Sequence, residues 1–376
     1  MWGKIYNLLG LLLVTGLISC GNNGVNNEND TSLRQQKITA GGHHTVVIKA
    51  DSSLWSWGDD YYGQLGDGLN DYQVVPDALF IQFSSNPVQV GKQKWLQVSS
   101  GDIHTLAQHE DGTLWAWGGN TDYSLGTTLD EDQHSPIQIS QDTDWIHISA
   151  GGFHNFGIKV DGTLWGWGDN GGNVLGLSDP LAGINIDRPT KIDNSTNWQQ
   201  ISGGRTHSVA IKTDGTLWGW GSLRLKNLQP MVIVQQISME SDWLQVSAGE
   251  YNTLIVKMDG TLWGWGLNQN SELGNNDSTE VDTITQIGNE TDWAYVSTGG
   301  GITAAIKQDG TLWAWGFYSK VPSQIGIDIK WISVATGRGH FVAQKDDGTI
   351  WTWGSNGLGQ LGNGTTEFQA LPVNIF

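Results

Sequence analysis

Residues 161–168 read Asp-Gly-Thr-Leu-Trp-Gly-Trp-Gly, and the 376-residue chain contains seven versions of this stretch. Each copy centres on a Trp-x-Trp pair, at Trp55/Trp57, Trp115/Trp117, Trp165/Trp167, Trp218/Trp220, Trp263/Trp265, Trp313/Trp315 and Trp351/Trp353. A recurring unit of this length cannot bury its own apolar face alone, so neighbouring copies must stack. The repeat therefore predicts a fold of similar stacked units rather than one large core.

Each copy is predicted to form a hairpin. Asp-Gly between two apolar runs favours a type I′ turn, in which both central residues have positive φ. The strand that follows alternates, so both tryptophans face one side, and the residue between them is small in nearly every copy. Large rings on one sheet can then fill the hollow of the next, which is propeller packing. The first copy carries Ser52 where six others carry glycine, so Ser52 is expected to be strained.

Four short apolar runs, A to D, make up each repeat. Run A is Trp-x-x-Val/Ile-Ser, B follows Gly-x-x-His, C holds Trp-x-Trp, and D is Pro-x-x-Ile with its proline expected at the strand start. The D-to-A connectors have hairpin length, which favours blades ordered D-A-B-C. The first repeat then lacks D and the last ends on it. We therefore predict an all-β, seven-bladed propeller of four-stranded blades over residues 33–376, closed by pairing of the N- and C-terminal strands.

The N-terminus has the pattern of a targeting segment. Lys4 precedes an apolar run over residues 8–18 that is too short to span a bilayer. Cys20, the only cysteine, ends a stretch that resembles the bacterial lipobox. We expect residues 1–19 to be a lipoprotein signal peptide, Cys20 to be lipidated, and residues 20–32 to include a flexible tether. Gly21 after the cysteine favours the outer membrane or the cell surface, on the extracytoplasmic side.

Charge and motif content restrict the function. The chain has 19 basic and 38 acidic residues, which argues against a nucleic-acid partner. No P-loop, HExxH, nucleophile elbow or paired-cysteine motif occurs, and no cofactor is expected. Tryptophans at a fixed register are expected in the core.

Two sets of polar residues could suggest metal sites. Five repeats carry a turn histidine, but sevenfold placement keeps these residues one blade apart, so no metal site is expected and a structural role with hydrogen bonds to the backbone is favoured. The histidines are His44, His104, His154, His207 and His340. A second set of carboxylates is expected on the opposite face as solvated turn acids, with cation binding left open. They are Asp142, Asp144, Asp242, Glu290 and Asp292.

The combined pattern of Gly-x-x-His-Thr, Asp-Gly-x-Leu-Trp-x-Trp-Gly and Asn-x-x-x-x-Leu-Gly resembles the regulator of chromosome condensation family. The resemblance covers residues 35–376 and is fullest over 348–362. It implies a seven-bladed propeller but no single activity, since members include a nuclear nucleotide exchange factor, a plant ultraviolet-B receptor and a secreted bacterial β-lactamase inhibitor. This chain is acidic and carries an export signal, and it lacks tryptophan at the photoreceptor's Gly-Trp-Arg-His-Thr position. The secreted protein-binding branch is the nearest analogy.

The A–B turns and the long C–D crossings should share one face of the ring, where the repeats differ most. Candidate binding residues there are His43, Asp102, Ile103, Phe153, Arg205, Glu250, Tyr251 and Arg338, with Tyr72, Phe80 and Phe83 from the longest crossing. The favoured function is a monomeric protein-binding module, held in the cell envelope by its lipid. A polysaccharide- or peptide-acting enzyme in the central pocket remains the second hypothesis, and it would need two carboxylates at the axis. A purely structural surface protein is the third.

Overall fold

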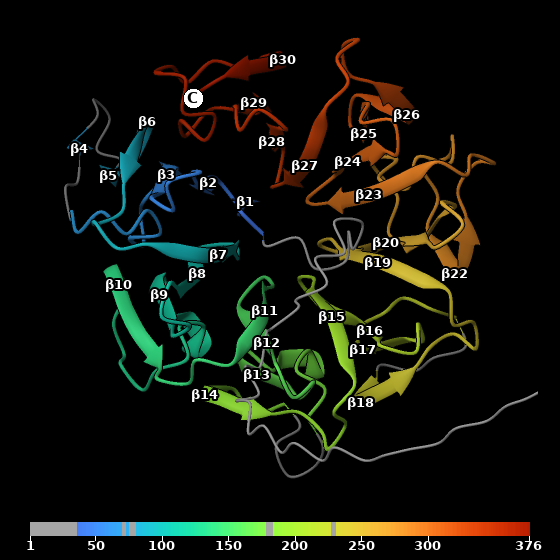
Figure 1. The fold of residues 1–376 in the computed structure, drawn as a ribbon, viewed down its shortest axis with the longest axis horizontal. Coiled ribbons are helices and arrows are strands. Elements are labelled where there is room, and N and C mark those ends of the chain that lie inside the picture. The colour runs from blue at the N-terminus through green and yellow to red at the C-terminus, as the bar shows by residue number, and fades with distance from the viewer. Residues whose placement is uncertain (1–35, 70–72, 75–79, 178–182, 227–230) are drawn as a thin grey trace, which may run out of the picture.

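The computed structural model describes residues 36–69, 73–74, 80–177, 183–226 and 231–376. Seven four-stranded antiparallel sheets surround a central axis, which confirms the predicted all-β propeller (Figure 1). Within these ranges the helical elements are two short 3-10 turns, η2 (Thr121–Tyr123) and η3 (Gly171–Asn173). A small hairpin of β4 (Gln73–Val74) and β5 (Phe80–Ile81), which the sequence did not predict, lies in the first crossing.

The four runs correspond to four strands in every blade. The A strands are β1 (Ile38–Ala40), β7 (Trp95–Ser100), β11 (Trp145–Ala150), β15 (Trp198–Gly203), β19 (Trp243–Ala248), β23 (Trp293–Thr298) and β27 (Trp331–Thr336). The B strands are β2 (His44–Ile48), β8 (His104–His109), β12 (His154–Lys159), β16 (His207–Lys212), β20 (Asn252–Lys257), β24 (Ile302–Lys307) and β28 (His340–Lys345). The C strands are β3 (Leu54–Asp59), β9 (Leu114–Gly118), β13 (Leu164–Gly168), β17 (Leu217–Gly221), β21 (Leu262–Gly266), β25 (Leu312–Gly316) and β29 (Ile350–Gly354). The D strands are β6 (Phe83–Gln89), β10 (Gln133–Ser140), β14 (Ile186–Lys191), β18 (Met231–Gln236), β22 (Val281–Gln286), β26 (Ser319–Gln324) and β30 (Gln369–Asn374).

Each blade is one whole repeat in the order A-B-C-D, so the predicted D-A-B-C order is wrong. The predicted pairing of the terminal strands is wrong with it, because β1 pairs with β2 and β30 pairs with β29. A connector of four residues spans about 16 Å, while the outer strand of one blade and the inner strand of the next are about 14 Å apart laterally. A hairpin-length connector is therefore also long enough for the crossing between blades.

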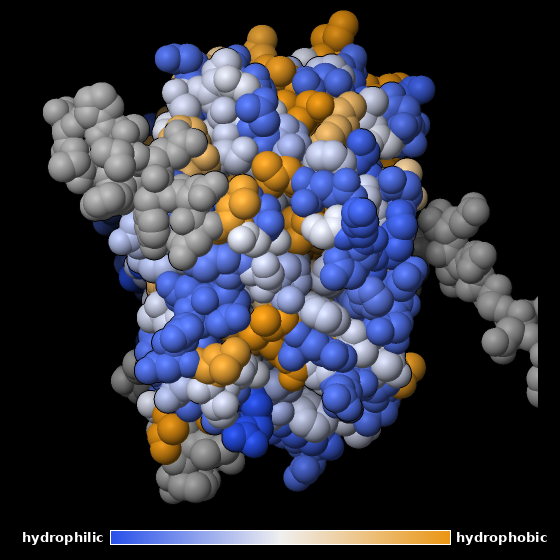
Figure 2. All heavy atoms as spheres, turned by 90° about the vertical axis from the view of Figure 1, so that its left-hand side faces the viewer, coloured by the Kyte–Doolittle hydropathy of each residue, from blue (hydrophilic) through white to orange (hydrophobic). Residues whose placement is uncertain are grey.

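The D strand is the outer edge of each blade, and in the five D strands that contain a proline it lies inside the strand rather than at its start. Pro189, for example, falls within β14, where the register with β13 shifts between Gly166 and Gly168. A proline cannot donate a ladder hydrogen bond, and at an outer edge it also discourages pairing with another chain. The rim over β6 and β10 is mostly hydrophilic, with apolar side chains in a few separate patches (Figure 2).

The Asp-Gly turns are type I turns followed by a bulge, not the predicted type I′ turns. Gly162 donates to the Lys159 carbonyl at 2.8 Å, Lys159 donates to Thr163 at 3.0 Å, and within the turn only Gly162 has positive φ. This three-residue loop needs one left-handed residue rather than two. In the first blade that residue is Ser52 with φ 65°, so the predicted positive φ is confirmed.

The tryptophans form the core between blades, as predicted, but the two members of each pair differ. The second, such as Trp117, is fully buried, whereas the first is only half-buried. The A-strand tryptophan packs on both, with Trp95 at 6.2 Å from Trp115 and 5.8 Å from Trp117 between ring centroids.

A different aromatic residue completes the first blade. Gln35 stands where the other repeats have the A-strand tryptophan, and the ring of Phe376 packs edge-on at 5.5 Å from Trp55 and 6.1 Å from Trp57. Lys49 lies 4.1 Å from the centroid of the Phe376 ring. Phe376 therefore adds an aromatic contact between blades 7 and 1, which are also joined by hydrogen bonds such as Thr45 Oγ1 to Gln360 O at 2.8 Å and share no sheet.

Candidate functional site

The two faces of the ring are defined by their turns. The turn face carries the A–B turns and C–D crossings, which are joined by bonds such as Asp169 N to Phe153 O at 3.0 Å. The Asp-Gly face carries the B–C turns and the connectors between blades, joined for example by Val160 N to Asp144 O at 2.8 Å. This confirms the predicted grouping of turns.

Backbone hydrogen bonds fix the A–B turns at the centre of the turn face. Asp102 N donates to Gly152 O at 3.1 Å, Arg205 N donates to Gly249 O at 3.2 Å, and Arg338 N donates to Gly42 O at 3.3 Å. These bonds link each turn to the next blade, and they require close approach. A Cβ on Gly101 would lie 2.6 Å from the Gly151 carbonyl oxygen, which explains the glycine of the Gly-x-x-His motif.

Four of the predicted binding residues meet in one ion-pair network. Arg338 Nη2 lies 2.6 Å from Asp102 Oδ2, and Arg338 Nε lies 2.8 Å from Glu250 Oε1. Arg205 Nη1 lies 3.2 Å from Glu250 Oε1 and 3.7 Å from Asp102 Oδ2. The four residues come from blades 2, 4, 5 and 7, so the network is built across the axis.

The network balances two cations against two anions at a partly buried position. Burial raises the pKa of Asp102, although Arg338 and Arg205 act to lower it. The side chain of Asp102 is 13% exposed, and those of the two arginines are about a third exposed. Paired guanidinium groups that water still reaches can exchange one carboxylate partner for another, which suits recognition of a polar surface.

The remaining predicted residues take no part in these ion pairs, and one of them lies outside the described residues. Burial lowers the pKa of His43, and the nearby Arg338 lowers it further. Ile103 and Phe153 are half-buried, and Tyr251 lies under Arg224, whose guanidinium is 5.3 Å from the ring centroid. The remaining three candidates belong to the first crossing. Tyr72 lies outside the described residues, Phe80 is in β5, and the half-buried Phe83 begins β6.

Sequence reasoning missed three aromatic residues on the turn face. Phe317, Tyr318 and Phe368 are all more than half exposed, and the rings of Tyr318 and Phe368 are 5.8 Å apart. The signal was present, because the sixth repeat lacks the Asn-x-x-x-x-Leu-Gly segment and its crossing is reduced to residues 317 and 318.

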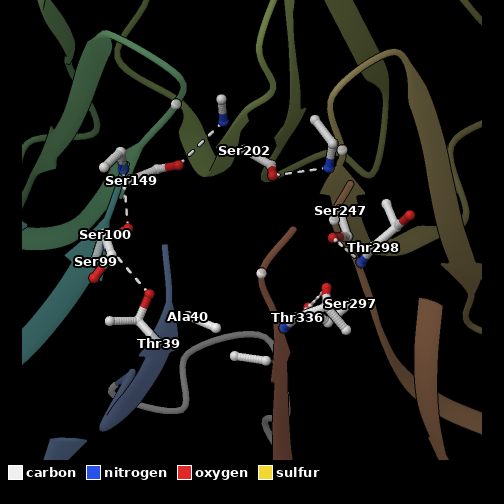
Figure 3. Close-up of a pocket in the computed structure, with 18 of the residues that line it drawn as sticks. Thr39, Ala40, Ser99, Ser100, Ser149, Ser202, Ser247, Ser297, Thr298 and Thr336 are labelled. Atoms are coloured by element: carbon white, nitrogen blue, oxygen red, sulfur yellow. Dashed lines mark hydrogen bonds between the residues drawn. The ribbon is translucent and has the colours of Figure 1, made fainter. Parts of the chain in front are cut away.

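A central cavity of about 450 Å³ runs behind the network and is lined by the A strands (Figure 3). Six hydroxyl groups there each accept a backbone N–H from the next blade, as Ser99 Oγ does from Ala150 N at 2.9 Å. The other five pairs are Thr39 with Ser100, Ser149 with Gly203, Ser202 with Ala248, Ser247 with Thr298, and Ser297 with Thr336.

Long polar side chains form a second layer of bridges between A strands. Gln200 accepts from Val246 N at 2.9 Å, Gln245 accepts from Val296 N at 3.0 Å, and Gln97 donates to Ile146 O at 2.9 Å. The inner strands are sheet edges, whose free backbone groups need partners. The polar lining of the cavity therefore has a structural explanation.

The turn histidines form a third layer of bridges, which confirms their structural role, but their Nε2 atoms bond side chains of the adjacent blade and not the backbone as predicted. His44 Nε2 lies 3.1 Å from Thr105 Oγ1, and His340 Nε2 lies 3.0 Å from Thr45 Oγ1, each reaching the adjacent blade. Burial is the main cause that lowers the pKa of His44, His154 and His340 to about 3. The same cause lowers the pKa of His104 and His207 to about 4. In the described ranges no three His, Cys, Asp or Glu residues lie close enough to hold a metal ion.

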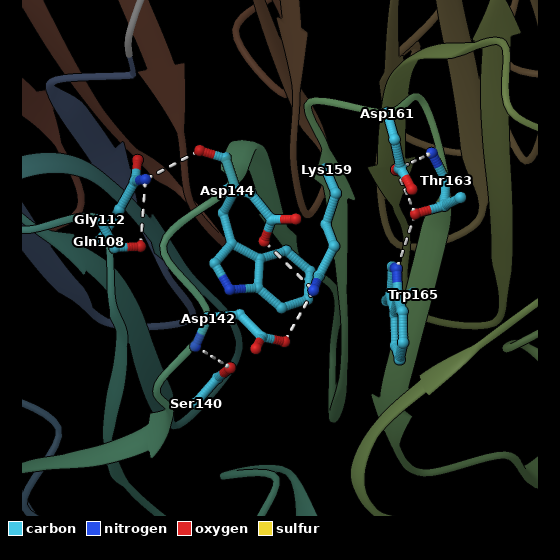
Figure 4. Close-up of polar contacts among 10 residues, drawn as sticks. Gln108, Gly112, Ser140, Asp142, Asp144, Lys159, Asp161, Thr163 and Trp165 are labelled. Carbon is cyan, nitrogen blue, oxygen red and sulfur yellow. Dashed lines mark hydrogen bonds and ion pairs between the residues drawn. The ribbon is translucent and has the colours of Figure 1, made fainter.

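The carboxylates of the Asp-Gly face bind lysines. Lys159 lies 2.7 Å from Asp142 and 3.2 Å from Asp144, with its ammonium group 4.8 Å and 4.7 Å from the ring centroids of Trp145 and Trp165 (Figure 4). Burial alone would lower the pKa of Lys159, but the two carboxylates outweigh it and raise the pKa. Lys257 and Lys307 repeat the arrangement with Asp242, Glu290 and Asp292. The expected solvated acids are therefore parts of repeated ion pairs.

Fold and site together define a seven-bladed propeller that presents non-repeated side chains on one face. The chain belongs to the regulator of chromosome condensation (RCC1) family, because the RCC1-like domain of that family matches residues 82–375. Its RCC1 repeat also matches residues 51–108 and 36–64. No helix within the described ranges is long and apolar enough to cross a membrane.

Similar proteins share this domain in different settings. The ultraviolet-B receptor UVR8 of Arabidopsis thaliana is 28% identical over 197 residues, which are 50% of this chain and 41% of the receptor. A bifunctional serine/threonine-protein kinase/NEDD4-like E3 ubiquitin-protein ligase of Dictyostelium discoideum is 37% identical over 114 residues, 28% of this chain and 6% of the relative. The chain thus spans less than half the length of either curated relative.

Two solved structures have the same fold. Human WBSCR16 superposes with a TM-score of 0.76 at 21% identity, over 87% of this chain and 94% of that one. Yeast RCC1 (Prp20) bound to Kap60 gives a TM-score of 0.75 at 18% identity, over 98% and 91% of the two chains.

Proposed function

We propose that the protein is a lipid-anchored, extracytoplasmic propeller that binds another protein through its turn face. The observation that carries this proposal is the network of Asp102, Arg205, Glu250 and Arg338, since none of its side chains repeats in all blades and all four meet at one place. Repeated contacts hold a ring together, whereas a unique polar cluster on a loop face is typical of recognition.

Two further points support a protein partner. Propellers of this family include Prp20, whose structures describe binding to Gsp1p, histones and Kap60. The cavity, the main alternative place for a ligand, is lined by groups that already bridge the inner strands.

The binding assignment is tested with protein capture from membrane fractions. Phe153→Ala, Arg205→Ala and Tyr251→Ala should each weaken capture of the partner, by tenfold or more for the best anchor, because aromatic and arginine side chains dominate interface energies. Val160→Ala, an exposed change on the Asp-Gly face, is the control. Equal loss with Val160→Ala would contradict the assignment.

The anchor is proposed from residues outside the structural description. Cys20→Ser should release the protein from membranes, because Cys20 is the single acylation site that the signal pattern offers. A variant that still sediments with membranes after a salt wash would exclude the lipoprotein hypothesis.

One observation favours the second candidate, an enzyme acting at the central pocket on polysaccharide or peptide. Asp102 and Glu250 are carboxylates that meet at the axis, as such an enzyme requires. Both carboxylates are paired with Arg205 and Arg338, so a substrate could contact them only after an ion pair breaks. Turnover of a glycan panel that Asp102→Asn abolishes would replace the binding proposal with this one.

A further inference from the structure

Three exposed aromatic residues of blades 6 and 7 form what we call the aromatic patch. It consists of Phe317, Tyr318 and Phe368, which are 59%, 56% and 51% exposed. The Tyr318 and Phe368 rings are 5.8 Å apart, and a hydrogen bond joins Tyr318 to Ser355 of blade 7. Single exposed apolar residues are ordinary, but a contacting group from two blades on one face indicates an interaction site.

The patch is exposed because blade 6 has almost no crossing. The neighbouring blades place residues 267–280 and 355–368 between their C and D strands, whereas blade 6 places only residues 317 and 318 there. Its A–B turn is also minimal, with glycine at positions 299, 300 and 301. Within the described chain no segment of blade 6 covers the two aromatic rings, and the fold does not bury them.

The aromatic patch is continuous with the ion-pair network. Phe317 lies against Gly301, where a Cβ would meet the phenyl ring at 2.3 Å. Gly300 lies against Arg338, where a Cβ would be 3.1 Å from the arginine side chain. Exposed aromatic rings next to partly exposed arginines have the composition of an interface hot spot.

The charge of the same face indicates the sign of the partner's charge. In the described parts of the crossings the exposed acids are Asp122, Asp130, Glu131, Asp132, Asp277, Glu280 and Glu367. The exposed cations there are Arg224 and Lys226, and these pair with Glu280 and Asp282. The excess charge that remains to meet a partner is therefore negative, and an approaching basic surface would be attracted.

We propose that the aromatic patch is the anchor of the turn-face interface, and that its partner is a basic protein surface presenting an apolar side chain. The apolar side chain packs on Phe317, Tyr318 and Phe368, while surrounding lysine or arginine residues of the partner meet the acidic crossings. This inference rests on the proposed protein-binding function and adds the partner's chemistry and its place on the ring.

The test uses the full-length chain as bait for a displayed library of random peptides. Enriched peptides should combine lysine or arginine with an aromatic or large aliphatic residue. They should bind the Phe317→Ala/Tyr318→Ala variant at least tenfold more weakly. The matched control, Val160→Ala/Met258→Ala, removes two equally exposed apolar side chains from the Asp-Gly face and should bind as the unchanged protein does. Thermal unfolding of both double variants checks that the ring is intact.

A second measurement tests the charge. Asp277→Asn/Glu367→Gln, which neutralises exposed acids in the crossings of blades 5 and 7 on either side of blade 6, should weaken binding of the same peptides several-fold and reduce the dependence of their affinity on salt. The inference would be overturned if the selected peptides were not enriched in basic residues. It would also be overturned if their affinity for the Phe317→Ala/Tyr318→Ala variant were within twofold of their affinity for the unchanged protein. If their binding instead depends on Arg205 and Tyr251 alone, the proposed function survives and the anchor assignment does not. Binding lost only in the Asp-Gly-face control, or no enrichment at all, counts against both.

Discussion

The two faces of the ring use the same types of charged residue in opposite ways. On the Asp-Gly face, lysines such as Lys159, Lys257 and Lys307 recur at one register, each between two tryptophans and two carboxylates. On the turn face, Arg205 and Arg338 share Asp102 and Glu250, and no other blade repeats the arrangement. Contacts that recur in many blades stabilise the ring, whereas those made once are free to serve recognition. This difference predicts where substitutions should affect stability and where they should affect binding.

Low pH should have the largest effect on the free energy of unfolding, because buried histidines form a repeated layer beneath the turn face. Burial lowers the pKa of His44, His104, His154, His207 and His340 to about 3 or 4, below the usual 6.5. The unfolded chain then binds more protons below pH 6.5, so stability is full above that pH and falls as the pH drops toward the folded values. Each such histidine contributes about 1.4 kcal/mol per pH unit.

Denaturant unfolding between pH 7 and pH 4.5 measures this slope. His207→Asn, which copies the natural Asn252 of the next repeat, should flatten the slope by about 1.4 kcal/mol per pH unit. A pH-independent stability over this range would mean that the histidines are not buried in neutral form.

A pair of glycines on the Asp-Gly face separates backbone strain from packing between blades. Gly162 and Gly348 have similar φ values of 75° and 84°, but only Gly162 is crowded, with a Cβ placed 2.2 Å from Thr196 O. Gly348→Ala should lower the free energy of unfolding by about 1 kcal/mol, because only the positive φ opposes the new side chain. Gly162→Ala should lower it by about 2–4 kcal/mol, because the methyl group is also crowded. Equal losses of stability in chemical denaturation would show that the connector to the next blade moves to accommodate the methyl group.

Two lysines compare the repeated and the non-repeated ion pairs directly. Lys257→Met removes a side chain that is 7% exposed and contacts Glu240 and Asp242, so we expect a loss of about 1–3 kcal/mol. Lys226→Met removes one that is 53% exposed and pairs with Asp282 on the turn face, and should cost less than about 0.5 kcal/mol. Similar losses of stability for the two variants in urea titrations would contradict the idea that repeated ion pairs stabilise the ring and non-repeated ones do not.

The smallest effect tests the junction between blades 7 and 1. Ala335 stands where six blades have a hydroxyl that bridges to the next A strand, and its counterpart across the junction is Ala40. Ala335→Ser should add one such bond and stabilise the ring by about 0.5–1.5 kcal/mol. Ala248→Ser is a control, since position 248 supplies a backbone N–H and not a hydroxyl. No gain in melting temperature from Ala335→Ser would mean that this junction has a different spacing from the others.

The sequence alone determined the fold class, because every copy of the repeat contains the same short sequence signals. Trp-x-Trp alternation, the Asp-Gly turn and the Gly-x-x-His turn each act over a few residues, and seven repetitions leave a ring as the way to bury all the tryptophans. The positive φ of Ser52 and the structural role of the turn histidines followed from the same local reasoning.

The tertiary structure decided what depends on distance between blades. A connector of four to six residues suits both a hairpin and a crossing to the next blade, so connector length did not fix the strand order or the way in which blades 7 and 1 join. The network joins Asp102 to Arg338, which are 236 positions apart and lie at the same position of the A–B turn in their two repeats. The spacing of residues within one repeat cannot predict this contact, because the contact forms only when the seven blades bring their A–B turns to a common axis.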